Sequence, residues 1–185
     1  MSRVSTAYLL TCAAIGVAGG IMLTAANWLS TALFATVPFI SVILIGLWLL
    51  PAVLGARLLE RPLAAVLVAL ISGLVAAPFS GYGFGSVATN LWYAVFVELP
   101  FLIVLYRFWK TWQYFVGAIV LGIAYPLLAA ASFDLASFPW WGQALFVLLT
   151  MASAVAGVAL GLAIADALRR TGVARVARRR PLARG

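Results

Sequence analysis

Long apolar runs, separated by short segments rich in proline, glycine or charge, divide the chain into six parts. A helix needs roughly 20 apolar residues to cross a bilayer, and each run approaches this length. None shows the alternation of apolar and polar positions that a membrane-spanning strand requires. We therefore predict an all-α membrane protein with six transmembrane helices, near residues 6–26, 36–56, 63–79, 87–106, 114–131 and 143–166.

The composition strengthens this prediction, since 66% of the 185 residues are hydrophobic and only 9% are charged. A water-soluble core of this size could not bury so much apolar surface. Six spans with short connections use almost the whole chain. We expect one transmembrane domain, residues 1–168, followed by a basic cytoplasmic tail, residues 169–185.

The positions of the basic residues predict the orientation in the membrane. If the N-terminus is cytoplasmic, all twelve Lys and Arg residues fall on the cytoplasmic side, where such residues are enriched. The predicted outer connections, near 27–35, 80–86 and 132–142, contain none. This partition predicts that both termini are cytoplasmic, that the number of spans is even, and that the chain lies in the inner (cytoplasmic) membrane. The net charge of +8 then favours contact with anionic lipid rather than with nucleic acid.

The chain lacks the residues that several kinds of catalysis and metal binding require. The chain has no histidine and one cysteine, Cys12. Paired carboxylates, clusters of metal-ligating residues and glycine-rich phosphate loops are absent from the sequence as well. We therefore expect neither an enzyme nor a bound metal or cofactor, and any nucleotide hydrolysis would fall to another chain.

The predicted outer connections are rich in aromatic residues. Tyr82 and Phe84 alternate with glycine, and Trp140 and Trp141 follow Pro139. Two explanations stay open: aromatic residues that anchor the protein at the membrane interface, or a lid over a planar heteroaromatic ligand. Glycine between the rings would let such a lid fold tightly.

Glu98 is the only acidic residue predicted deep inside a span. A carboxyl group at that depth is costly and needs a partner or a ligand. Asn90 lies two turns earlier on the same helix face, with Tyr93 alongside, so these residues are candidates for a substrate-binding wall. Hydrogen bonds between helices are the alternative explanation.

Small residues recur at helical spacing in the first and last spans. Ala14 and Ala18, Gly16 and Gly20, and Gly157 and Gly161 are each four residues apart. Such pairs allow close contact between helices. The spacing leaves open whether the contact is internal or with another subunit.

Three segments carry a family resemblance: Glu60-Arg61-Pro62-Leu63, the stretch from Glu98 to Lys110, and Ala165-Asp166-Ala167-Leu168-Arg169-Arg170. Over roughly residues 36–180 the chain resembles the YkoE-type S components of energy-coupling factor (ECF) transporters. The resemblance implies a six-helix protein that captures thiamine or its hydroxymethylpyrimidine precursor from outside. It also implies partners, namely a transmembrane coupling subunit and two ABC ATPases.

The resemblance also implies residue roles. Glu98 matches the family's glutamate in the fourth span, and Ala14 and Ala18 match the small-residue surface that meets the coupling subunit. The chain departs from the family where Val37 precedes Pro38 and where Ala152-Ser153 stands in place of an arginine, which makes the expected pocket less polar. The alternative function is a structural or assembly membrane protein without a small-molecule ligand.

Overall fold

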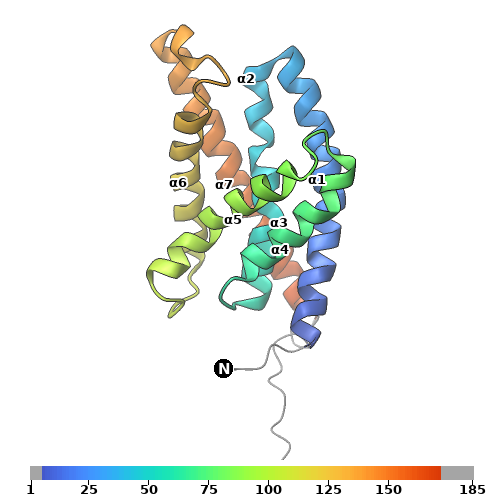
Figure 1. The fold of residues 1–185 in the computed structure, drawn as a ribbon. Helices are drawn as coiled ribbons and strands as arrows, with labels where there is room; N and C mark the ends of the chain where they lie inside the picture. Colours follow the sequence, from blue (N-terminus) through green and yellow to red (C-terminus); the bar gives the residue numbers. More distant parts are fainter. Residues whose placement is uncertain (1–5, 172–185) are drawn as a thin grey trace, which may run out of the picture.

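The computed structural model describes residues 6–171, and this part of the chain contains helices and no strand. The elements are α1 (Thr6–Thr36), α2 (Pro38–Ser41), η1 (Val42–Leu44), α3 (Ile45–Leu59), α4 (Ala64–Ala76), η2 (Ala77–Phe79), α5 (Gly85–Ile103), α6 (Thr111–Ala129), η3 (Leu135–Ser137) and α7 (Trp140–Arg170). Figure 1 shows them as one bundle. The all-α prediction is confirmed.

Within the described residues, five helical segments are long and apolar enough to cross a membrane: Thr6–Thr36, Val42–Leu59, Gly85–Ile103, Thr111–Ala129 and Trp140–Arg170. The sixth apolar segment, Ala64–Phe79, is shorter. Each of the six lies at one of the predicted positions. The exact number of spans stays a prediction.

The first predicted span ends ten residues too early, since α1 continues from residue 26 to Thr36. The predicted connection 27–35 is therefore wrong. Its polar residues favoured a loop, but in the structure they bond to their own helix. Thr31 Oγ1 donates to the Asn27 carbonyl at 2.9 Å, and Thr36 Oγ1 donates to the Ala32 carbonyl at 2.9 Å. Such bonds let Thr stay inside a helix, and they leave Asn27 on a helix face.

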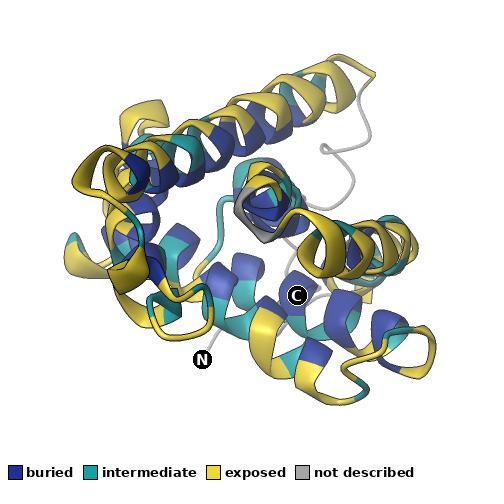
Figure 2. Ribbon diagram, turned by 90° about the horizontal axis from the view of Figure 1, so that it is seen from above, coloured by how far each residue is buried: buried dark blue, intermediate teal, exposed yellow. Residues whose placement is uncertain are grey.

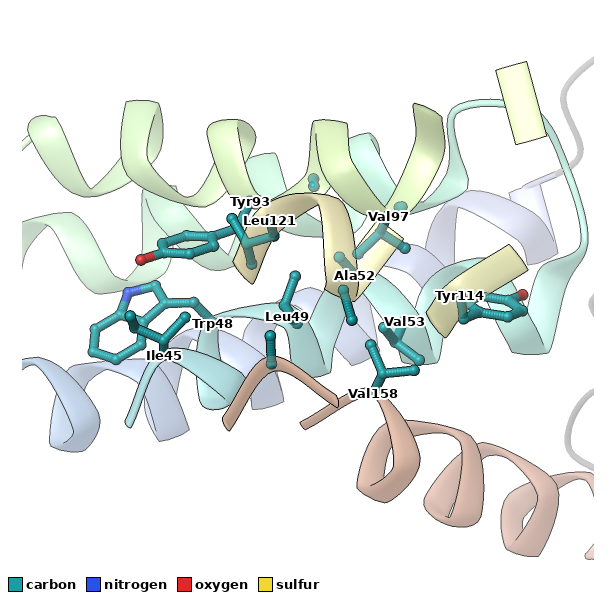
Figure 3. Close-up of a cluster of buried hydrophobic side chains, with 14 of the residues drawn as sticks. Ile45, Trp48, Leu49, Ala52, Val53, Tyr93, Val97, Tyr114, Leu121 and Val158 are labelled. Carbon is teal, nitrogen blue, oxygen red and sulfur yellow. The ribbon is translucent and has the colours of Figure 1, made fainter. Parts of the chain in front are cut away.

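Helix α3 is the centre of the bundle, and most of its residues are buried. It contacts α7 at backbone distance: a Cβ atom built on Gly46 would overlap the Ser153 carbonyl, and one on Gly157 would overlap Gly46. Ser153 Oγ accepts from the Gly46 amide at 2.9 Å and donates to the Ile43 carbonyl at 2.6 Å. The core around α3 appears in Figure 3.

The small residues of α1 face two directions. Gly16 and Gly20 pack against Ile71 and Val75 of α4, and Ser72 Oγ donates to the Gly16 carbonyl at 3.0 Å. Ala14 and Ala18 are exposed on the outside of the bundle. The glycine pairs of α1 and α7 therefore serve internal packing, while Ala14 and Ala18 have no packing role in this chain. Figure 2 shows the same division in the other helices, with buried faces turned inward.

The bundle has two chemically different ends (Figure 1). At the lower end in that view, here named the basic end, α1 begins, α7 finishes, and the connections 60–63 and 104–110 turn. At the opposite end, here named the cavity end, α1 meets α2 and the connection at 130–139 turns, while the connection at 80–84 turns on the side of the same half of the bundle. The basic residues of the described chain belong to the basic end: Arg57, Arg61, Arg107, Lys110, Arg169 and Arg170.

Candidate functional site

A cavity of about 410 Å³ lies at the cavity end, between α1, α3, α5 and α6. Its wall is aromatic and polar but uncharged. The aromatic side chains are Phe34, Trp48, Tyr82, Tyr93, Tyr125 and Phe133. The polar side chains are Asn27, Ser30, Ser41, Ser86, Thr89 and Ser132. A volume of this size matches that of small-molecule sites.

Three of the aromatic rings lie in a row on one side of the cavity, the first pair tilted and the second pair stacked. The ring centroids of Trp48 and Tyr93 are 6.2 Å apart with an interplanar angle of 33°, and those of Tyr93 and Tyr125 are 6.5 Å apart at 22°. Figure 3 shows Trp48 and Tyr93 next to one another at the end of the core. Because the rings come from α3, α5 and α6, packing of the bundle fixes their orientation. The arrangement offers flat faces on which another ring can stack.

Asn27 is the most unusual polar group of the cavity. Its side chain is only 4% exposed, and its Nδ2 atom has no hydrogen-bond partner within residues 6–171. A buried donor without a partner costs about 1–3 kcal/mol. Native structures retain few such groups, and those that remain need an explanation. A bound ligand that accepts this hydrogen bond would supply one.

A second cavity, of about 430 Å³, adjoins the first between α5 and α6. The two share Thr89, Tyr93, Tyr125 and Ala129, and the second is also lined by Leu128, which is 68% exposed. The site therefore opens sideways between two helices as well as toward the cavity end.

The structure brings two of the residues predicted for substrate binding to the cavity, Tyr82 and Tyr93. Phe84, Trp140 and Trp141 do not line it, and their side chains are 80%, 81% and 60% exposed. These three residues therefore project from the cavity end instead of covering the cavity.

Asn90 and Glu98 lie on one buried face of α5, as the sequence predicts, but neither lines the cavity. Asn90 Nδ2 donates to the Ser86 carbonyl at 2.7 Å, within its own helix. Glu98 is near the basic end of α5, where its carboxylate accepts hydrogen bonds from the Leu63 amide at 2.6 Å and the Ala65 amide at 3.2 Å.

Glu98 thus caps the N-terminus of α4. The first turn of a helix has amide groups without partners and carries a partial positive charge, so a carboxylate there is stabilising. Leu63 has a left-handed backbone, with φ of 61°, which presents its amide to Glu98. The sequence revealed no partner for this carboxylate because the partner is the backbone of another helix.

Ion pairs join α3 and α7 at the basic end. The Arg57 guanidinium donates to both carboxylate oxygens of Asp166, at 2.9 and 3.3 Å. Arg169 pairs with Glu60 and donates to the Arg57 carbonyl. These contacts hold the end of α7 against the turn between α3 and α4.

The sequence does not identify Asn27, Trp48 and Tyr125 as site residues. Asn27 falls in the predicted connection 27–35, and the other two lie within predicted spans, where an aromatic residue is usually part of the core or faces lipid. A polar side chain within an extended first helix is the signal that could have identified Asn27.

Fold and cavity together define a polytopic helical membrane protein with a ligand-sized site. A family model described as "ABC-type cobalt transport system, permease component" matches residues 8–124, and the chain belongs to this family. A solved structure described as "Crystal structure of an S-component of ECF transporter" superposes with a TM-score of 0.81 at 17% sequence identity, over 92% of this chain and 88% of that chain. At this identity the match shows a shared fold. A comparison with curated proteins gave no match.

Proposed function

We propose that this chain is the substrate-binding S component of an ECF-type ABC importer. The observation that carries the proposal is the uncharged, aromatic-lined cavity at one end of a bundle with the S-component fold. Membership of an ABC transport family supports it. The chain has no nucleotide-binding motif of its own, so the energy would come from a transmembrane coupling subunit and two ABC ATPases.

The charge distribution supports a cytoplasmic basic end and an outward-facing cavity end. Lys and Arg residues concentrate on the cytoplasmic side of membrane proteins, and both termini would then be cytoplasmic, in the inner membrane. Arg3 and five arginines of the predicted tail lie outside the described residues. We assign them to the same side, where the tail would contact anionic lipid.

The substrate that the family resemblance suggests is thiamine or hydroxymethylpyrimidine. Both contain a flat aminopyrimidine ring, which suits the stacked faces of Trp48, Tyr93 and Tyr125. No covalent chemistry is required of the site, and the protein is proposed to be neither an enzyme nor a cofactor carrier.

Cobalt, which the family description names, is the second candidate substrate. A cobalt site is expected to use imidazole, carboxylate or thiolate ligands. The chain has no histidine, and residues 6–171 contain no group of three or more His, Cys, Asp or Glu that could hold a metal ion. The donor atoms of the cavity wall favour an organic ligand.

A structural or assembly protein without a ligand is the remaining alternative. Close packing stabilises helix bundles in lipid, and a purely structural role requires neither an aromatic-lined cavity of about 410 Å³ nor an unpaired amide in its wall. The cavity therefore favours capture of a small molecule over a purely structural role.

The test is isothermal titration calorimetry of the purified protein in lipid nanodiscs with thiamine, hydroxymethylpyrimidine and Co²⁺. We expect saturable binding of an organic probe, and weaker binding to Tyr93→Ala. The matched control is Phe84→Ala, because Phe84 is an exposed aromatic residue outside the cavity. Binding of Co²⁺ alone would support the second candidate, and no heat with any probe would support the structural role.

A further inference from the structure

We infer that the cavity selects an uncharged heteroaromatic ring and rejects a ligand with a fixed positive charge, and that Asn27 is the hydrogen-bond donor that recognises the ring. This inference rests on the proposed function, because it assumes that the cavity binds the transported molecule. It separates the two substrates that the resemblance leaves together, since thiamine carries a permanent thiazolium charge and hydroxymethylpyrimidine does not.

The first argument is the location of the negative charges. The chain has four acidic residues, Glu60, Glu98, Asp134 and Asp166. Three of them are held at the basic end: Glu98 by the amides of α4, Asp166 by Arg57, and Glu60 by Arg169. Asp134 is exposed and does not itself line the cavity, although the adjacent Ser132 and Phe133 do. None of the four carboxylates therefore forms part of the cavity wall.

A cation in the cavity would lose part of its hydration and would gain no counter-ion from the wall. Contacts with the aromatic faces offset only part of this loss. An uncharged ring does not face this cost, and it keeps the full benefit of stacking.

The second argument is the geometry of the rings. Cages for quaternary ammonium groups surround the cation with several aromatic faces. Here the planes of Trp48, Tyr93 and Tyr125 are inclined by only 33° and 22° from one ring to the next. Phe34 and Phe133, which also line the cavity, meet edge to face at 83°. The first three rings therefore form one flat wall, and the phenylalanine pair lies beside it. The preferred guest of such a wall is another flat ring.

The third argument is the unpaired amide. Asn27 Nδ2 can only donate a hydrogen bond, so it recognises an acceptor atom. The ring nitrogens and hydroxyl oxygen of an uncharged pyrimidine are acceptors. Asn27 lines the same cavity as the stacked rings, so one ligand can stack and accept at the same time.

The experiment is calorimetric titration of the wild type, Asn27→Ala and Asn27→Asp with three probes at a pH slightly above neutral, which keeps the pyrimidine unprotonated and the thiazolium ring closed. The probes are hydroxymethylpyrimidine, thiamine, and thiochrome, which is an uncharged molecule of about the size of thiamine. Thr36→Ala is the control, since Thr36 is an exposed residue of the same helix that does not line the cavity. Thermal unfolding shows which variants are folded.

We expect the wild type to bind hydroxymethylpyrimidine about a hundredfold or more tightly than thiamine, as the cost of burying an unpaired cation implies. Asn27→Ala should weaken binding of hydroxymethylpyrimidine by about tenfold, as loss of one buried hydrogen bond implies. Asn27→Asp, which nearly keeps the size of the side chain, should reverse the preference toward thiamine. Thr36→Ala should behave as the wild type.

Three results would overturn the inference while leaving the proposed function intact. One is wild-type affinity for thiamine equal to or above that for hydroxymethylpyrimidine. Another is folded Asn27→Ala and Asn27→Asp proteins that keep the wild-type preference. The third is exclusion of thiochrome together with thiamine, which would show that the cavity rejects bulk and not charge. No binding of any probe would instead contradict the proposed function itself.

Discussion

The two ends of the bundle treat buried polar groups differently. At the basic end the carboxylate of Glu98 accepts two amide hydrogen bonds, and Arg57 and Asp166 form a two-bond ion pair. At the cavity end Asn27 has an unpaired amide group beside a hollow of about 410 Å³. Side chains at the basic end therefore tie helices together, whereas the cavity end offers an unpaired donor beside a ligand-sized space.

An unpaired donor alone does not distinguish the ends. Near the basic end the buried hydroxyls of Tyr106 and Tyr114 and the Nε atom of Arg169 also lack a partner within residues 6–171. The difference lies in the surroundings, since Tyr114 is packed in the core against Phe101, with ring centroids 4.7 Å apart. Only the combination of donor, space and flat rings marks a binding site.

The largest effect on stability is expected from Glu98→Ala at the basic end. Removal of the carboxylate leaves two amides of α4 without their acceptor and should lower the free energy of unfolding by about 2–3 kcal/mol. Glu98→Gln keeps one acceptor oxygen and should lower it by about 1 kcal/mol. Thermal unfolding in detergent measures both changes.

Ligand affinity of the folded Glu98 variants should stay within about twofold of the wild type, since Glu98 does not line the cavity. Calorimetry on the folded fraction checks this expectation. A large loss of affinity in Glu98→Gln with unchanged stability would show that the sequence-based assignment of Glu98 to the substrate site was the better one.

The next effect is on binding and belongs to the cavity end. Thr89 is exposed and lies in the wall shared by both cavities. Thr89→Trp should fill the shared space and weaken ligand binding by about tenfold or more, with little change in stability. Thr89→Val nearly keeps the shape of the side chain and should bind as the wild type. Equal affinity of all three proteins would place the ligand elsewhere.

The sequence predicted the helices well because a bilayer imposes a long and strong apolar signal. It predicted the end of α1 and the partner of Glu98 poorly, for related reasons. The Thr31 hydroxyl donates to a backbone carbonyl of α1. The Glu98 carboxylate accepts from the backbone amide of Leu63, which is 35 residues away in the sequence. Backbone partners leave no trace in residue identity. The sequence did not identify Trp48 and Tyr125 as cavity residues for another reason. The rotation of a helix about its axis decides whether an aromatic side chain faces lipid, core or cavity, and the sequence does not fix this rotation.

A smaller effect is expected from Arg57→Gln, which breaks the pair with Asp166. The pair is partly exposed, with 16% and 44% of the two side chains accessible, so its loss should cost about 1 kcal/mol. Because salt screens exposed charges, the difference from the wild type should shrink at high ionic strength. Thermal unfolding at low and high salt measures it. Arg107→Gln is the control, since Arg107 is exposed at the same end and forms no ion pair among the described residues.

The smallest effect on the isolated chain is expected from Ala14→Leu with Ala18→Leu. Both alanines are exposed on α1, so the double variant should unfold within about 0.5 kcal/mol of the wild type and should bind ligand normally. It should nevertheless lose co-purification with the ECF coupling subunit and ATPases, because leucine side chains would keep a partner helix from approaching. Ala163→Leu, an exposed alanine on α7, is the matched control and should still assemble. If the α1 variant assembles as well as this control, the coupling subunit does not dock on this face of α1.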